Sequence, residues 1–487
     1  MDAVRTVQYS DHFLMKILLV AINARYSHVS YSARTLRANL GILANDAAIL
    51  ESDLDVTPIQ IAEQIARHHP RIVGFSVYLW NVRLVEAIAR ILRMILPQTR
   101  LIAGGPELTP EYANASHFDA VIIGEGETAF RNLCTRYFSD ASHDQPHISD
   151  SSPLIHSPPE PTDALVLPFD DYTDADLAQR TIYVETSRGC PYSCSYCTSA
   201  NTKLRLFSLE TLLPALDRLW QRGIRRLKFL DRSFNAPVTH ACAVLDFFLS
   251  RVTPGTGCCA GGTCLHFEIN ADHLHPDIFD RIAAFPQETL HLEVGVQTLN
   301  PTVAAAIGRS ADTAQSLENL CRLTHETGAT VHADLIFGLP GEDEDSFAQG
   351  FNTLIATAHP PEVQVNLLKG LPGTRILRDA HTLGLAFNPE PPYEVLQTDV
   401  MNFETLRRIQ RFARCWEIIH NRHRFPNEVA QFHSATAPNY YHAYNTLADR
   451  IFSDEGKLFA ISQSRVAHYL HAHLADLEIQ ATKSGRQ

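Results

Sequence analysis

The sequence lacks an excess of positive charge. Its 41 lysines and arginines are outnumbered by 54 aspartates and glutamates, which gives a net charge of −13. Surfaces that bind nucleic acid usually carry a basic stripe. The composition therefore argues against nucleic acid as the partner of this chain, although a local basic patch is not excluded.

Long apolar runs are also missing. The longest one near the start, Ile17–Ile22, has too few residues for a membrane span or for the apolar region of a signal peptide. We therefore expect a cytoplasmic protein with no membrane partner. The chain has 487 residues, of which 45% are hydrophobic and 20% are charged, and this mixture predicts a globular protein of two or three domains.

Cysteine is sparse as well, since ten cysteines in this length are too few for a disulfide scaffold. Three of them cluster in the stretch Cys190-Pro-Tyr-Ser-Cys194-Ser-Tyr-Cys197, which follows a strand-like run. Soft thiolates on one tight loop suit three irons of a 4Fe–4S cluster, and the absent fourth cysteine leaves one iron for a non-protein ligand. Zinc is the weaker alternative, because zinc sites usually take four ligands in spaced pairs and no second pair stands nearby.

A second group of cysteines lies in a glycine-rich stretch and comprises Cys258, Cys259 and Cys264. These residues could form an auxiliary metal site, but adjacent cysteines are awkward chelators. The other cysteines are expected to be ordinary buried thiols.

The spacing Cys-x-x-x-Cys-x-x-Cys after a strand resembles the radical S-adenosylmethionine (radical SAM) enzymes. The resemblance implies that Cys190, Cys194 and Cys197 hold the cluster and that S-adenosylmethionine chelates the open iron through its amino and carboxylate groups. It also implies that the reduced cluster cleaves this cofactor to a 5′-deoxyadenosyl radical. Tyr196 occupies the family's aromatic position near the adenine.

Residues 16–137 alternate short apolar runs with helical patterns, which predicts an α/β domain with a parallel, Rossmann-like sheet. Polar residues and glycines follow the predicted strands, where open α/β sheets bind their ligands. Taken alone, this pattern fits a purely structural domain equally well, because a fold does not determine a function.

Directly ahead of the cysteine loop, this domain resembles the flavodoxin-like cobalamin-binding domain of cobalamin-dependent radical enzymes. The loop after the first strand lacks the motif Asp-x-His-x-x-Gly, so the resemblance implies cobalamin without a protein histidine beneath the cobalt. The residues that it assigns to cobalamin are Asn23, Tyr26, His28, Ser76, Leu79, Gly104, Gly105, Pro106, Glu107, Gly124, Glu125 and Glu127.

Strand and helix patterns alternate again over residues 179–375 and give six βα units, which predicts a partial (β/α)6 barrel of the TIM type with its active site at the carboxyl ends of the strands. Polar residues stand at several of these ends. The resemblance implies that S-adenosylmethionine is bound by Tyr196, Asp231, Glu268, Gln297, Ile336 and Gly338.

The predicted domain organisation has five parts. They are a disordered leader at 1–15, the cobalamin domain at 16–137, a linker at 138–178, the barrel at 179–375 and an α-helical C-terminal domain at 376–487. The sequence does not decide whether Met1 or Met15 is the true first residue of the protein. The stretch Pro391–Thr398 is predicted to be an ordered loop that could cover the barrel mouth.

The resemblance implies a cobalamin-dependent radical SAM enzyme that methylates an unactivated carbon, with a flavodoxin or ferredoxin as its reductant. Three alternatives stay open. The enzyme could catalyse a rearrangement, cyclisation or oxidation; its first domain could have lost cobalamin; or the chain could be an iron–sulfur redox sensor or binding protein. No pattern identifies the substrate, which could be a small molecule or a peptide.

Overall fold

The structure is a computed structural model, which describes residues 16–109, 117–139, 154–253, 257 and 262–484. The chain forms two compact units. The first comprises the residues up to Ser187 together with Arg205–Leu230, and the second comprises Arg188–Leu204 and the residues from Asp231 onward.

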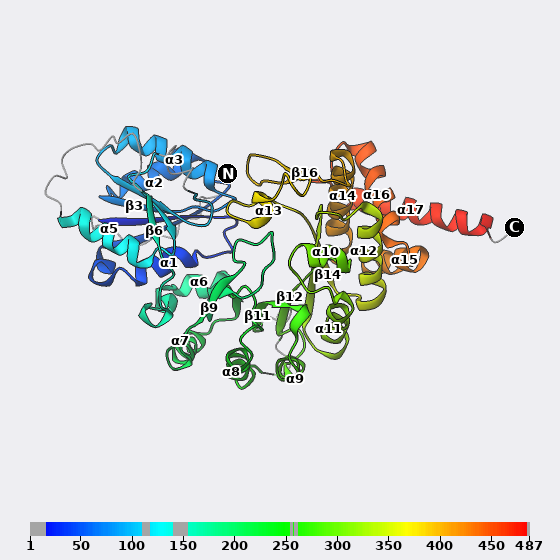
Figure 1. Cartoon of the computed structure of the whole chain (residues 1–487), viewed down its shortest axis with the longest axis horizontal. Coiled ribbons are helices and arrows are strands. Elements are labelled where there is room, and N and C mark those ends of the chain that lie inside the picture. Colours follow the sequence, from blue (N-terminus) through cyan, green and yellow to red (C-terminus); the bar gives the residue numbers. More distant parts are fainter. Residues whose placement is uncertain (1–15, 110–116, 140–153, 254–256, 258–261, 485–487) are drawn as a thin grey trace. The chain divides into compact units, whose positions relative to one another are not determined.

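The first unit contains a parallel six-stranded sheet in the order β2-β1-β3-β4-β5-β6 (Figure 1). This is the flavodoxin-like order with one strand added, so the predicted Rossmann-like fold is confirmed. The strands are β1 (Ile17–Asn23), β2 (Ala47–Asp53), β3 (Ile72–Ser76), β4 (Arg100–Gly104), β5 (Ala120–Gly124) and β6 (Leu154–Ser157). The helices are α1 (Tyr31–Ala38), η1 (Gly41–Asp46), α2 (Pro58–Arg67), α3 (Val82–Ile95) and α5 (Glu127–Ser139).

Both faces of this sheet are covered by helices, which explains why every residue of β1 is buried. Alternate side chains of a strand point to opposite faces. Leu18, Val20 and Ile22 pack with residues of α2 and α3, whereas Ile17 and Leu19 pack with residues of α1 and α5. A continuous apolar run is therefore what this central position requires.

The segment predicted to be a linker contains regular structure. Besides β6, which pairs with β5, it holds η2 (Thr162–Ala164), η3 (Pro168–Asp171) and α6 (Asp174–Gln179). A four-residue strand among serines and prolines is too short to show a period of two in the sequence. The boundaries of the five parts remain a prediction.

A buried ion network fastens α6 to the Rossmann-like sheet. Arg34 contacts Glu51 at 3.0 Å and Asp176 at 2.8 Å, and Arg180 contacts the same two carboxylates at 2.7 and 3.1 Å. Charges that leave water need such partners. The network joins Arg34 to Asp176 and Glu51 to Arg180, which are more than a hundred positions apart, so no local sequence pattern predicts it.

The six barrel strands follow in the predicted alternation with helices. In the first unit β7 (Ile182–Val184) pairs in parallel with β10 (Arg226–Phe229), which follows α7 (Leu209–Gln221). In the second unit β11 (Cys264–Asn270), β12 (Leu290–Gln297), β13 (Thr330–Phe337) and β14 (Glu362–Leu367) form parallel neighbours in this order. Their helices are α8 (Val238–Leu249), α9 (Pro276–Ala284), α10 (Pro301–Ala306), α11 (Thr313–Glu326) and α12 (Glu344–Ala358), with the short η5 (Ala271–His273).

The strands of the second unit are two-faced rather than apolar throughout. In β12 and β13 every second residue is buried and apolar, while most of the residues between them are polar and partly exposed. A strand buried on both faces would be apolar throughout. A partial barrel instead keeps a polar inner face along its whole length, and this face holds the sites described below.

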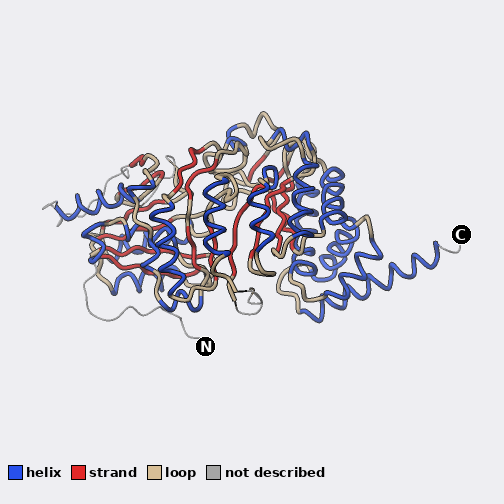
Figure 2. The backbone as a smooth tube through the Cα atoms, turned by 90° about the horizontal axis from the view of Figure 1, so that it is seen from below, coloured by secondary structure: helices blue, strands red, loops and turns tan. Residues whose placement is uncertain are grey.

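The last block is helical, as predicted. It comprises α14 (Phe403–Trp416), the π-helical turn η6 (Glu417–Asn421), α15 (Pro426–Thr436), α16 (Tyr440–Glu455) and α17 (Gln463–Ser484) (Figure 2). Phe351 of α12 contacts the rings of Phe412 and Trp416 edge-on at 4.9 and 4.8 Å. Before these helices come α13 (Arg375–Arg378) and the antiparallel strands β15 (Ala386–Phe387) and β16 (Val395–Gln397).

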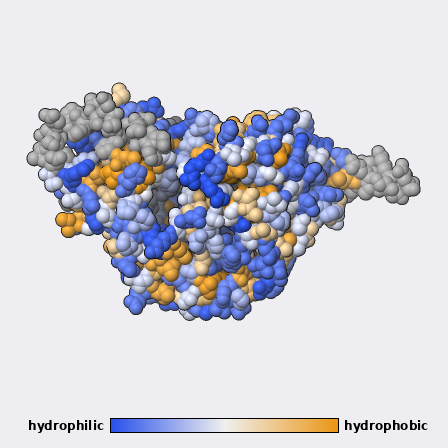
Figure 3. Space-filling model, in the orientation of Figure 1, coloured by the Kyte–Doolittle hydropathy of each residue, from blue (hydrophilic) through white to orange (hydrophobic). Residues whose placement is uncertain are grey.

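The surface drawn in Figure 3 intersperses hydrophilic and hydrophobic residues. The most exposed large apolar side chains are Ile42 and Met94 of the first unit. Among the described residues, no helix is both long enough and apolar enough to cross a membrane.

Candidate functional site

The three clustered cysteines lie on one closed loop between β8 (Ser187–Cys190) and β9 (Thr202–Leu206), which pair with each other. None of the three forms a disulfide. The amide of Cys197 donates to the carbonyl of Cys194 at 3.1 Å, which makes a tight turn. Thr202 closes the loop, because its hydroxyl accepts from the amide of Cys190 at 2.9 Å and donates to Ser199 at 2.7 Å. Three unpaired thiols on one loop fit the predicted 4Fe–4S cluster.

Residues from two other segments of the second unit hold this loop in place. Ser193 donates to the carbonyl of Gly308 at 3.1 Å, and the amide of Ser195 donates to Ile307 at 2.8 Å. Ile376 of α13 donates to the carbonyl of Ser195 at 2.9 Å. Gly308 has a φ of +79°, and a Cβ there would lie 2.5 Å from the Ser193 carbonyl oxygen. The close approach therefore depends on glycine.

Arg309, which the sequence analysis missed, lies beside the cysteine loop. Its guanidinium donates to Asn270, Asp272 and the carbonyl of Gly295 at 3.1, 2.9 and 2.8 Å, and it is almost fully buried. Burial lowers the pKa of Arg309, but the neighbouring Tyr196, Asp272 and Cys194 outweigh it and raise the pKa. A single arginine after a glycine in a turn carries no motif, so only the fold reveals it.

Tyr196 shares this environment. Burial, and then the nearby Cys194, raise the pKa of its hydroxyl, so the phenol stays protonated. Tyr192, in the same loop, also lies near Cys190 and Cys194, and its ring stacks on His273 with centroids 5.4 Å apart. Aromatic rings thus pack close to the thiols and limit the access of water, which a strongly reducing centre requires.

The predicted S-adenosylmethionine residues occupy the carboxyl halves or ends of their strands. Asp231 is buried, and Glu268 lies on the polar face of β11. Gln297 ends β12 with a φ of +69°, and its amide nitrogen would lie 2.5 Å from a Cβ on Gly295. Ile336 lies on the same face of β13. The structure brings these positions to one end of the sheet; their contacts with the cofactor remain a prediction.

Asn235 fastens the segment that begins at Asp231 to the end of β11. Its side chain exchanges hydrogen bonds with the backbone of Asn270, 2.9 Å in each direction, and donates to the carbonyl of His273 at 2.7 Å. A residue that satisfies three backbone groups fixes a loop far better than packing alone. Asn235 is a second positioning residue that the sequence did not reveal.

The stretch Pro391–Thr398 packs at the mouth of the barrel. The amide of Val395 donates to Leu368 at 2.9 Å, directly after β14. Gly338, the residue after β13, has a φ of +83°, and a Cβ there would lie 2.7 Å from the Val395 side chain. Gly338 therefore makes a tight contact with this covering segment, and its role toward S-adenosylmethionine remains a prediction.

Glu342 is buried at the same end of the sheet. Burial raises its pKa to about 7, while the hydrogen bond that the Thr298 hydroxyl donates at 2.5 Å acts in the opposite direction. The raised pKa means that the folded state prefers the neutral acid. Its stabilising effect is fully present below the unfolded pKa of 4.5 and is lost as the pH rises through 7.

We expect Glu342→Gln to flatten the pH dependence of stability. Between about pH 5 and pH 8 the wild-type protein should lose up to about 3 kcal/mol that the variant retains. Urea unfolding midpoints at both pH values measure this difference. Glu326→Gln, at a half-exposed position of α11, serves as the control and should leave the slope unchanged. Equal slopes for wild type and Glu342→Gln would contradict the assignment.

Eight of the twelve residues assigned to cobalamin fall into two sets. Ser76 and Gly104 end adjacent strands in direct register, and the hydroxyl of Ser32 donates to Ser76 at 3.0 Å. Gly105 follows with a φ of +133°. Small residues and hydroxyls at the edge next to the β1/β3 switch point fit a bulky ligand that approaches the backbone closely.

The second set makes protein contacts. His28 shares a hydrogen bond of 2.6 Å between its Nδ1 and the hydroxyl of Tyr183, and burial lowers its pKa. Asn23 donates to the carbonyl of His28 and to Glu51, both at 3.0 Å. The other members of this set are Tyr26, which donates to Gln179; Glu125, which pairs with Arg205; and Glu127, which is buried at the start of α5.

Tyr78 and Trp80 form an exposed aromatic pair at this edge, which the sequence analysis did not single out. Their rings stack with centroids 4.5 Å apart, and 47% of Trp80 is exposed. The indole donates to the carbonyl of Ile22 at 3.0 Å. The pair flanks the predicted Leu79. The roles of Leu79, Pro106, Glu107 and Gly124, like those of the other residues assigned to cobalamin, remain predictions.

We expect Gly105→Ala to destabilise the first unit by about 2 kcal/mol and to weaken cobalamin binding. A Cβ would lie 2.2 Å from the carbonyl oxygen of Val77 at a backbone angle that only glycine adopts readily. Gly41→Ala is the matched control, because Gly41 has a φ of +60° with no atom within 4 Å of the added carbon. Thermal unfolding and retained corrin absorbance report the two effects. A stability loss no larger than that of Gly41→Ala would contradict the clash.

Comparison with known proteins gives three matches along the chain. A family model described as the B12 binding domain matches residues 17–134, and the Radical SAM superfamily matches residues 184–354. The chain is a radical SAM protein with a B12-binding domain. A family of unknown function, DUF4080, matches residues 381–481 of this radical SAM protein.

Two curated relatives are identical to this chain at about a quarter of the aligned residues. The 2-(S-pantetheinyl)-carbapenam-3-carboxylate methyltransferase of Streptantibioticus cattleyicolor is 24% identical over 63% of this chain and 48% of its own length. The cobalamin-dependent radical SAM methyltransferase TokK of Streptomyces tokunonensis is 25% identical over 65% and 49%. The radical SAM protein thus spans about half the length of these relatives.

A solved structure shares the fold. The cobalamin-dependent S-adenosylmethionine radical enzyme OxsB, with aqua-cobalamin and S-adenosylmethionine bound, aligns with a TM-score of 0.62. The alignment covers 96% of this chain and 81% of OxsB at 14% identity. The predicted fold class is confirmed, and the predicted cofactors agree with the two family models. Cys258 and Cys259 of the predicted auxiliary site lie outside the described residues.

Proposed function

We propose that this radical SAM protein is a cobalamin-dependent methyltransferase that acts on an unactivated carbon of a small molecule or peptide. The observation that carries the proposal is the presence, in one chain, of a B12-binding domain and of three unpaired thiols on one anchored loop. The methyltransferase names of the two curated relatives support it.

The chain's own residues would perform four tasks. Cys190, Cys194 and Cys197 hold the cluster, which when bound supplies the electron that cleaves S-adenosylmethionine. Arg309 fixes the cysteine loop, and its positive charge offsets the negative charge of the nearby thiolates and of Asp272. The segment Pro391–Thr398 closes the mouth of the barrel and keeps water away from a reactive carbon radical.

The remaining residues would position the small cofactors. Asp231 carries the buried carboxylate that the amino group of S-adenosylmethionine requires, and Glu268 and Gln297 lie on the same polar face for its ribose and carboxylate. Ser76 and Gly104 would receive cobalamin. A flavodoxin or ferredoxin is the proposed reductant, because the cluster needs a low-potential one-electron donor.

The test uses the full chain, reconstituted without oxygen with iron, sulfide and hydroxocobalamin. Dithionite and methyl-deuterated S-adenosylmethionine are added together with an extract of small metabolites. We expect 5′-deoxyadenosine, S-adenosylhomocysteine and one product that carries the deuterated methyl group. A substrate-dependent product without the label would establish rearrangement, cyclisation or oxidation instead. If neither 5′-deoxyadenosine nor bound S-adenosylmethionine is found, the enzyme proposal is wrong.

A further inference from the structure

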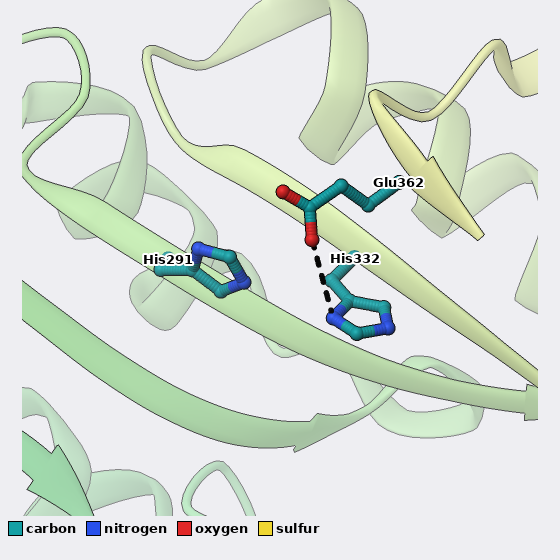
Figure 4. Close-up of side chains that lie close together, drawn as sticks. All are labelled: His291, His332 and Glu362. Carbon is teal, nitrogen blue, oxygen red and sulfur yellow. Dashed lines mark ion pairs between the residues drawn. The ribbon is translucent and has the colours of Figure 1, made fainter. Parts of the chain in front are cut away.

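We propose that this chain has a second metal site, which binds zinc, at the amino ends of β12, β13 and β14. His291, His332 and Glu362 come from these three neighbouring strands, and one ligand atom of each lies within 4.8 Å of the others (Figure 4). Two imidazoles and one carboxylate are the donor set of open zinc sites. The proposal is independent of the proposed function.

The register of the three strands places the side chains of His291, His332 and Glu362 next to one another. His332 and Glu362 are direct partners across β13 and β14. His291 faces Thr330, which stands two residues before His332 on the same strand. Because side chains alternate with a period of two, all three lie on the polar inner face of the sheet. The backbone, rather than flexible loops, therefore fixes the trio.

The two ring nitrogens of His332 have different surroundings. Its Nδ1 lies 3.6 Å from Glu362 Oε2, on the side where an ion would bind. Its Nε2 is buried, makes no hydrogen bond with any described residue, and lies 3.5 Å from Asp334 Oδ1. A ligating histidine commonly presents its second nitrogen to a carboxylate, which fixes the tautomer and raises its basicity. Asp334 is placed for that task.

His423 offers a fourth ligand. Its Nε2 lies 3.9 Å from Glu362 Oε1, and 57% of its side chain is exposed, so that it is free to turn toward an ion. The nearby Asn421 holds this segment against β14, because its side chain exchanges hydrogen bonds of 3.1 and 2.9 Å with the backbone of Val363. A metal would thus join the helical block to the barrel strands.

The distances suit zinc after a small adjustment. Ligand atoms about 2.05 Å from a tetrahedral zinc are about 3.4 Å apart. The 3.6 Å between His332 and Glu362 already comes close to this value. The most distant pair, within 4.8 Å, needs to approach by about 1.4 Å at most. Rotation of partly exposed imidazoles supplies such a movement.

The proposed site is separate from the cysteine loop. The loop is anchored by residues beyond the carboxyl ends of the strands, whereas His291 is the second residue of β12. Gln297 lies six positions after His291, which corresponds to about 20 Å of strand. Residues at the amino end of such barrels usually serve stability rather than chemistry. The ion would fasten three strand starts to one another.

The test is metal analysis of the full chain with its iron–sulfur cluster in place. The protein is given one equivalent of zinc without oxygen and is then desalted, and zinc and iron are measured separately by mass spectrometry. We expect about one zinc per chain in the wild type. His332→Ala and Glu362→Gln should each lower bound zinc at least tenfold with iron unchanged, and zinc should raise the Tm of the wild type alone.

Two controls keep the result unambiguous. His325→Ala, at an exposed position of α11, should retain zinc, and so should Cys194→Ala, which tests for zinc in the cysteine loop. Glu362→Gln removes the negative charge with little change of shape, so it answers the question if His332→Ala fails to fold. Zinc that remains in both site variants, zinc that disappears with Cys194→Ala, or no retained zinc in the wild type would each overturn the proposal.

Discussion

Cys194→Ala is expected to abolish the formation of 5′-deoxyadenosine from S-adenosylmethionine. The loop supplies only three thiolate ligands to the cluster, so the loss of one leaves an iron without a protein ligand. We expect bound iron to fall well below four per chain and the rate of cleavage to fall by at least about a thousandfold, the scale on which an essential group acts. Iron analysis and chromatography of the nucleoside products measure both effects.

The matched control is Cys321→Ala. Cys321 is also a partly buried free thiol, but it lies in α11 and outside the cysteine loop. It should retain iron and activity. An active Cys194→Ala with a normal iron content would show that the loop does not hold the cluster, whereas loss of iron in both variants would point to general instability.

The second large effect is expected for Arg309→Met. The substitution leaves Asp272, which is buried, without its cationic partner, and breaking a buried ion pair in this way costs about 3–5 kcal/mol. Arg309 also hydrogen-bonds Tyr196 and lies close to Cys194, so its loss is expected to displace the cysteine loop. A displacement of the order of 1 Å at a reacting centre costs about a hundredfold in rate. We therefore expect kcat for S-adenosylmethionine cleavage to fall about a hundredfold.

Three measurements separate a positioning role from a structural one. The midpoint of urea unfolding reports stability, the iron content reports the cluster, and the split between KM and kcat reports geometry. Arg67→Met, which removes an exposed i,i+4 pair with Glu63, should cost less than about 1 kcal/mol and leave kcat unchanged. A folded Arg309→Met protein with full iron and unchanged kcat would contradict the positioning role.

Local chemistry could be predicted from the sequence wherever a motif is contiguous. The cysteine loop is one such case, because the eight positions from Cys190 to Cys197 contain the ligands, the turn and the aromatic residue. Likewise, short apolar runs such as that of β1 alternate with helical patterns, and this alternation predicted a buried parallel sheet. Strand β6 escaped prediction because four residues show no period.

Residues whose meaning depends on distant partners could not be predicted. The cobalamin assignment of His28 stays a prediction, but the partner of its ring, Tyr183, lies more than 150 positions away and could not be read from the loop. Arg309 and Asn235 have no motif of their own, and their importance rests on the groups that the barrel brings to them. The same holds for Arg34, whose partners include Asp176 of a segment predicted to be a linker.

The sequence by itself determined the class of chemistry, because a metal-binding loop and the period of buried strands are encoded in neighbouring residues. Only the tertiary structure decided which polar side chains meet. His291, His332 and Glu362 are separated by 41 and 30 residues in the chain, and they come together because the register of parallel strands aligns their amino ends. Strand register follows from the packing of the opposite, apolar face of the sheet, which no single segment of the sequence contains.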